Sequence, residues 1–199
     1  MYIGEKITSV KRNIRGYKVG LGVFNNALTP QLQRQIEEVK KHYGQLSPYV
    51  QFAITLQTTL IVRRGAFEAE KQRIMLQEEF NHFRKRLNYY FFKKGNYRNP
   101  QINSLLILPV IEGSGFSPEG KRTLHYHVGL GNVPNHINDI ELQKIIRDIW
   151  LKVKYSQDKI DLQPADPGWA DYITKEVEQG NIDCIDWRNA CIPHEALHI

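Results

Sequence analysis

An amphipathic helix predicted over residues 141–153 constrains the fold of this chain most strongly, because its apolar side chains fall on one stripe. The stripe is formed by Leu142, Ile145, Ile146, Ile149 and Val153. A helix with a single apolar face is stabilised only when another element buries that face. We therefore expect this helix to cover a β-sheet.

Four segments have the apolar pattern of β-strands. Residues 50–58 alternate between apolar and polar side chains, which places Thr55 on the polar face. Residues 104–112 and 121–130 are joined by a loop rich in glycine and proline, which predicts an antiparallel pair. A short strand is predicted over residues 159–163.

Three further segments have helical spacing or helix-end signals. Thr29 can cap a helix that is expected to end at Gly44, and residues 67–92 have apolar positions at helical intervals. A short helix over residues 169–178 should end at Gly180. Strands and helices in this order predict an α+β domain, in which an antiparallel sheet carries helices mainly on one face.

Length and composition suit a folded globular protein. The 199 residues fit one domain, or one domain with terminal extensions, and 41% of them are hydrophobic while 24% are charged. The first residues lack the apolar core of a signal peptide, and no apolar run is long enough to span a bilayer. We expect a cytoplasmic protein without membrane contact, in which Cys184 and Cys191 are reduced.

The net charge of +6 and the isoelectric point of about 9.2 favour an anionic partner such as nucleic acid. Basic side chains cluster in the N-terminal segment and in a mid-chain run made of Arg84, Lys85, Arg86, Lys93, Lys94 and Arg98. Aromatic residues are interleaved with the mid-chain run, and such mixtures suit stacked bases and phosphates. The alternative is a solvated helix whose aromatic side chains pack inward.

Two histidines on one strand form the clearest candidate for a metal site. His125 and His127 are two positions apart, so both imidazoles should project from the same face. Glu112 ends the preceding strand, and in a hairpin it can offer an oxygen ligand beside them. Such a set suits a divalent cation, Mn²⁺ or Mg²⁺, although histidine-rich sets also bind softer ions. The alternatives are ordinary strand histidines and a solvent-facing Glu112.

Tyr172 and Lys175 lie three positions apart in the last predicted helix and should share a face. A free tyrosine has a pKa of about 10 and is a poor nucleophile near neutral pH, but a neighbouring ammonium favours the phenolate. Without the histidines upstream, this pair would be interpreted as an ordinary amphipathic turn.

These motifs, in this order, resemble those of rolling-circle replication initiators in the HUH endonuclease superfamily. Phe52-Ala-Ile-Thr-Leu56 stands on an early strand, His125-Tyr-His127 with Val-Gly-Leu on a later one, and Tyr172-Ile-Thr-Lys175-Glu on a following helix. The stretch PVIEGSG resembles the strand that carries the third ligand. The resemblance covers residues 50–180 and implies a ferredoxin-like or RRM-like sheet. We expect a basic segment and first helix over residues 1–45 packed on the core, a catalytic domain over 46–182 and a C-terminal tail over 183–199.

The resemblance implies that His125, His127 and Glu112 bind the cation and that Tyr172, assisted by Lys175, attacks a scissile phosphate. The product would be a 5′-phosphotyrosine at the origin of a plasmid, phage or satellite element. Single-stranded or origin DNA would be the substrate, and Lys121 and Arg122 would contact its phosphates together with the mid-chain basic run. A host helicase and polymerase would complete replication, because 199 residues leave no room for a helicase domain.

Two other functions fit the same residues. A transposase or mobilisation nickase would use the same chemistry on different DNA ends, although the tyrosine following the histidines favours an initiator or a small transposase over conjugative relaxases. A non-catalytic nucleic-acid-binding module would use the sheet as a platform for bases. The C-terminal segment has the residue types of a zinc site, namely Cys184, Cys191, His194 and His198. The alternative is an ordinary tail in which these residues bind no metal.

Overall fold

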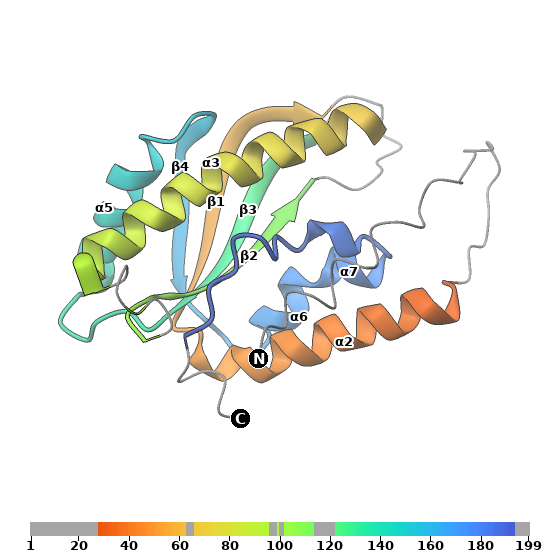
Figure 1. Cartoon of the computed structure of the whole chain (residues 1–199), viewed down its shortest axis with the longest axis horizontal. Helices are drawn as coiled ribbons and strands as arrows, with labels where there is room; N and C mark the ends of the chain where they lie inside the picture. Colours follow the sequence, from red (N-terminus) through yellow and green to blue (C-terminus); the bar gives the residue numbers. More distant parts are fainter. Residues whose placement is uncertain (1–27, 63–65, 96–98, 100–101, 114–121, 194–199) are drawn as a thin grey trace.

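The computed structural model describes residues 28–62, 66–95, 99, 102–113 and 122–193. Four strands form one sheet in the order β2-β3-β1-β4, and all neighbouring strands are antiparallel. The strands are β1 (Phe52–Val62), β2 (Leu106–Glu112), β3 (Arg122–Gly131) and β4 (Ser156–Pro164). The predicted α+β class with an antiparallel sheet is confirmed (Figure 1).

Five α-helices and two 3₁₀ turns complete the described part of the chain. They are α2 (Pro30–Leu46), η2 (Ser47–Tyr49), α3 (Ala66–Phe92), α5 (Asp139–Trp150), α6 (Trp169–Ile173), α7 (Lys175–Glu178) and η3 (Ile182–Cys184). The Thr29 side chain caps α2 by accepting a hydrogen bond from the Leu32 amide at 3.2 Å, as its position predicted. The helix predicted over residues 169–178 is instead two short helices that meet at Thr174.

The main core lies between one face of the sheet and the helices α3 and α5 (Figure 1). The apolar stripe of α5 is buried there, as predicted for a helix that covers a sheet. Phe80 of α3 packs against Tyr126 of β3, with ring centroids 4.1 Å apart. Trp150 at the end of α5 meets Phe83 of α3 edge to face. These aromatic contacts fix both helices on this face of the sheet.

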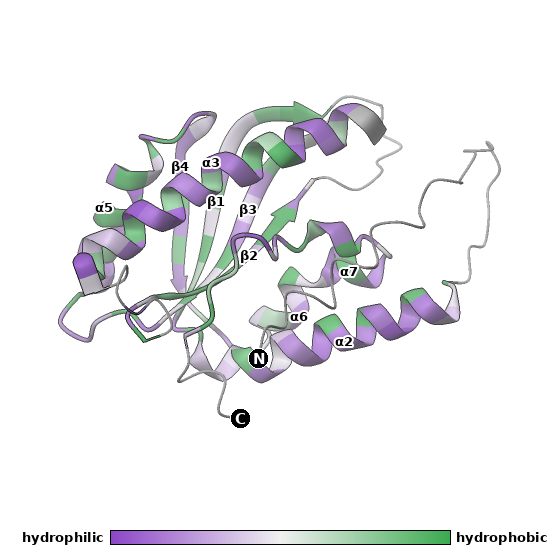
Figure 2. Ribbon diagram, in the orientation of Figure 1, coloured by the Kyte–Doolittle hydropathy of each residue, from purple (hydrophilic) through white to green (hydrophobic). Residues whose placement is uncertain are grey.

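A second, smaller core covers part of the opposite face, over β2 and β3. It brings α2, α6 and α7 against Leu106, Leu108 and Val110 of β2. Because both faces of β2 are covered, this strand is almost entirely buried. In contrast, no residue of β4 is buried, and most of this strand is hydrophilic (Figure 2). The first helix therefore packs on the sheet, through Ile36, Val39 and other apolar side chains.

Residues 185–191 run along the outer edge of β2, which differs from the expected C-terminal tail. Ile185 bridges to Val110 and Cys191 bridges to Ile107, both antiparallel. Cys184 is fully buried, and the Asp186 carboxylate accepts a hydrogen bond from the Tyr126 hydroxyl at 2.7 Å. The segment thus protects the backbone groups of an edge strand. His194 and His198 of the zinc series lie outside the described residues.

None of the helices in the described part of the chain combines the length and the apolar character that crossing a bilayer requires.

Candidate metal centre

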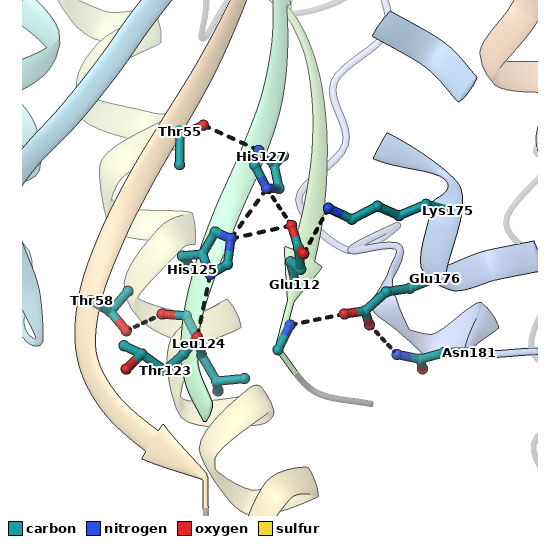
Figure 3. A network of polar contacts seen from close by, with 11 residues as sticks. Thr55, Thr58, Glu112, Thr123, Leu124, His125, His127, Lys175, Glu176 and Asn181 are labelled. Carbon is teal, nitrogen blue, oxygen red and sulfur yellow. Dashed lines mark hydrogen bonds and ion pairs between the residues drawn. The ribbon is translucent and has the colours of Figure 1, made fainter. Parts of the chain in front are cut away.

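The strand register brings the three predicted ligands together on one face of the sheet (Figure 3). Glu112 of β2 pairs with His125 of β3, and His127 lies two residues further along the same strand. One Glu112 oxygen, Oε2, lies 2.5 Å from His127 Nε2 and 3.3 Å from His125 Nε2. The two Nε2 atoms are 3.2 Å apart. The predicted convergence of the imidazoles and the carboxylate is therefore present.

The donor set fits a divalent cation. One ligand atom from each of the three residues lies within 4.8 Å of the others, and no other such group of three was found in the described part of the chain. The Glu112 side chain is 22% exposed, and those of His125 and His127 are 20% and 10% exposed, so the cluster is partly open to solvent. Two imidazoles and a carboxylate would leave further coordination positions of such a cation open to other ligands.

The outer nitrogen of each imidazole already has a partner, which orients both rings. His125 Nδ1 donates to the Thr123 carbonyl at 3.3 Å, and His127 Nδ1 lies 3.1 Å from the Thr55 hydroxyl of β1. A donating Nδ1 leaves the Nε2 lone pair free for a metal. The alternation of residues 50–58 placed Thr55 on this face, but its role beside His127 was not predicted.

Glu112 is surrounded by hydrogen-bond donors, one of which is the Lys175 ammonium. Hydrogen bonds from His125 and His127 are the largest influences that hold the pKa of its carboxyl far below the ordinary value, and Lys175 adds to them against the opposing effect of burial. Lys175 Nζ lies 2.8 Å from Glu112 Oε1. For Lys175, burial alone lowers the pKa, but the bond and charge of Glu112 outweigh it and the net direction is upward. Glu112 is therefore held as an anion and Lys175 as a cation.

Tyr172 lies on the same side of the sheet as the histidines. Its ring stands edge to face against His127, with centroids 5.4 Å apart, and Lys175 Nζ lies 4.4 Å from the centre of the phenol ring. Tyr172 is 54% exposed, so about half of the residue's surface is open to solvent. Lys175 thus stands between the carboxylate and the phenol.

Trp169 and Gly129 explain why α6 lies at this place. The Trp169 indole lies directly over Gly129 of β3, where a Cβ atom would approach it to 2.2 Å. Gly129 is two residues after His127 and shares its face of the strand. The absence of a side chain at this position therefore lets α6 lie flat on the histidine strand, which brings Tyr172 to His127.

Glu176 is a site residue that the sequence analysis missed. Its buried carboxylate accepts a hydrogen bond from the Gly113 amide at 3.0 Å and another from the Asn181 side chain at 2.6 Å (Figure 3). Gly113 has a φ of +90°, and a Cβ there would lie 2.7 Å from the Thr123 carbonyl oxygen. The sequence signal for Glu176 was only a charged residue next to Lys175.

The basic residues predicted to bind DNA do not gather at this cluster. Arg84, Lys85, Arg86, Lys93 and Lys94 belong to α3 or the turn that follows it, and α3 packs on the opposite face of the sheet. Arg84 is bonded to Asn81, and Arg86 donates to the Lys152 carbonyl. Lys121, Arg98 and the side chain of Arg122 lie outside the described part of the structure. For the whole set of basic residues, a role in binding DNA stays a prediction.

Comparisons with protein-family models, with curated proteins and with solved structures find no match for this chain.

Proposed function

We propose that this chain is a divalent-metal-dependent endonuclease that cuts single-stranded DNA with Tyr172 as its nucleophile, in the manner of a rolling-circle replication initiator. The observation that carries the proposal is the placement of Tyr172 against His127, beside the only cluster of three metal-ligating residues found in the described part of the chain. Lys175 contacts both the carboxylate and the phenol of this arrangement. The net charge of +6 supports a polyanionic substrate.

Glu112, His125 and His127 would hold the cation, Mn²⁺ or Mg²⁺, through the carboxylate and the two Nε2 atoms. When bound, the cation would polarise a phosphate oxygen and offset the charge that develops there. Thr55 and the Thr123 carbonyl keep the imidazole rings oriented for this task.

In the proposed reaction, the Tyr172 oxygen attacks the phosphorus atom of a phosphodiester. A bond between phosphorus and the tyrosine oxygen forms, while the bond from phosphorus to the 3′-oxygen breaks. The phenol gives its proton to solvent, and the departing 3′-oxygen takes one up, which leaves a 3′-hydroxyl and a 5′-phosphotyrosine. The Lys175 ammonium favours the phenolate by its charge. Attack by the 3′-hydroxyl on this link in a later step would rejoin the strand.

The test is to incubate the protein with 5′- or 3′-labelled single-stranded DNA and Mn²⁺, and to look for a covalent species on a denaturing gel. Wild type should form an adduct that retains the label downstream of the cut, and a chelator should abolish it. Tyr172→Phe should bind the DNA but form no adduct. Tyr90→Phe is the matched control, because Tyr90 is also an exposed tyrosine but lies on α3, on the far side of the sheet.

An adduct formed by Tyr172→Phe at the wild-type rate would refute the assignment of the nucleophile. Binding of DNA without any cleavage in Mn²⁺ or Mg²⁺ would instead indicate a non-catalytic nucleic-acid-binding module.

A further inference from the structure

Glu176 is a buried carboxylate at the junction of the sheet and α7. It is 6% exposed, although glutamate is almost never buried without partners. Its oxygens accept from the Gly113 amide and from the Asn181 side chain, and its own carbonyl accepts from the Asn181 amide at 3.0 Å. Both carboxylate oxygens are thus used, one toward the sheet and the other toward the end of α7.

These bonds join the two halves of the candidate site. Gly113 directly follows Glu112, the carboxylate ligand at the end of β2, and Lys175 directly precedes Glu176. The Gly113 amide lies beyond the last residue of β2, so the strand ladder does not hold it. Glu176 supplies the hydrogen-bond acceptor for this amide and so fixes the end of β2 against α7.

The bond between Glu176 and the Gly113 amide matters because two sets of partners compete for the Glu112 carboxylate. Its Oε2 faces both imidazoles, while its Oε1 faces Lys175. If the end of β2 moved by about 1 Å, one of these two sets of contacts would be lost, since a hydrogen bond weakens steeply beyond its normal length. The position of residue 113 therefore determines whether Glu112 can serve the imidazoles and Lys175 together.

We propose that Glu176 is a positioning residue, whose hydrogen bond to the Gly113 amide sets the distance between the metal-binding end of β2 and the helices that carry Tyr172 and Lys175. This inference rests on the proposed function, in which Glu112 is a metal ligand. Glu176 touches neither metal nor substrate and acts only through Glu112 and Lys175.

The first test is the affinity for Mn²⁺, measured by titration at a temperature well below the unfolding midpoint of each variant. Glu176→Met fills the same space without an acceptor and should weaken Mn²⁺ binding about tenfold, the lower end of what loss of an outer-shell partner costs. Glu176→Gln keeps an oxygen for Gly113 and should stay within about threefold of wild type.

Thr174→Ala is the matched control for simple destabilisation. Thr174 is buried and its hydroxyl donates to the Ala170 carbonyl at 2.8 Å, so the variant loosens the same helical segment without touching Gly113. It should lower the unfolding temperature and leave the Mn²⁺ affinity unchanged. An equal loss of affinity in Thr174→Ala, or wild-type affinity in Glu176→Met, would overturn the proposal.

The second test does not depend on metal. Amide hydrogen exchange at Gly113 in the metal-free protein should be at least about tenfold faster in Glu176→Met than in wild type, because the amide loses its acceptor. If Glu176→Met fails to fold, Glu176→Asp keeps the charge but is too short to reach both partners, and it should show the same change. Unchanged Gly113 exchange would overturn the positioning role, whereas faster exchange in a protein that binds no Mn²⁺ would support it and refute the proposed function alone.

Discussion

Replacing Gly129 by alanine should displace α6 from the histidine strand, because Trp169 fills the space over this glycine. A Cβ atom at residue 129 would lie 2.2 Å from Trp169 Cη2 and 2.5 Å from Cζ2. Ordinary contact begins at 3.4 Å, so the indole must withdraw by about 1.2 Å. Trp169 is buried in the second core, and its neighbours must move with it.

The size of the effect follows from this displacement. Overpacking a well-packed core usually costs about 1–3 kcal/mol, and we expect the free energy of unfolding of Gly129→Ala to fall by roughly that amount. Tyr172 lies one helical turn after Trp169, so the phenol moves with the indole. A misplacement of about 1 Å can lower a reaction rate about 100-fold, which is the loss expected for formation of the DNA adduct.

Urea unfolding would measure the stability, and single-turnover cleavage of labelled DNA in saturating Mn²⁺ would measure the rate. Gly44→Ala is the control, because nothing lies within 4 Å of a Cβ atom at that exposed helical position. If Gly129→Ala unfolds at the wild-type urea concentration, the close contact with Trp169 does not exist in solution. If it is destabilised but cleaves at the wild-type rate, Trp169 does not position Tyr172.

Two further variants test the electrostatics. Burial raises the pKa of Asp186, although hydrogen bonds from Asn189 and Tyr126 oppose the rise. The folded protein therefore favours the neutral carboxyl, and the wild type loses stability as the pH rises from the unfolded-state pKa through the higher folded-state pKa. Asp186→Asn should therefore gain stability relative to wild type between pH 4 and pH 7, measured by urea unfolding; a constant difference would contradict the shift. Lys175→Met removes the ammonium beside Glu112, so Mn²⁺ should bind on the order of tenfold more tightly while adduct formation slows. Weaker Mn²⁺ binding would mean that Lys175 supports the cation site instead of competing with it.

Local patterns in the sequence were enough to predict most of the elements and the core of the site. The α5 stripe predicted a helix that covers a sheet, and the two-residue spacing of His125 and His127 predicted a shared face. The glycine-rich loop predicted the antiparallel pairing that brings Glu112 to His125. Each of these inferences depends on residues that are close in sequence or joined by a single hairpin.

The missed features depend on contacts between distant segments. Glu176 and Gly113 are 63 positions apart, and no periodic pattern relates them. Residues 185–191 resembled a tail because their pairing partner, β2, lies far upstream. The helix predicted over residues 169–178 divides at Thr174, whose backbone has a φ of −90° and a ψ of 7°. Helical spacing in the sequence does not reveal such a break.

The sheet order explains why the histidines are on β3 in particular. β3 lies between β2 and β1, so a side chain on its open face has a neighbour on either side. His127 uses both: Glu112 of β2 approaches its Nε2, and Thr55 of β1 meets its Nδ1. On an edge strand, one of these partners would have to come from a loop, which holds a side chain less rigidly. A central strand therefore allows one imidazole to be oriented by one neighbouring strand while it faces a carboxylate from the other.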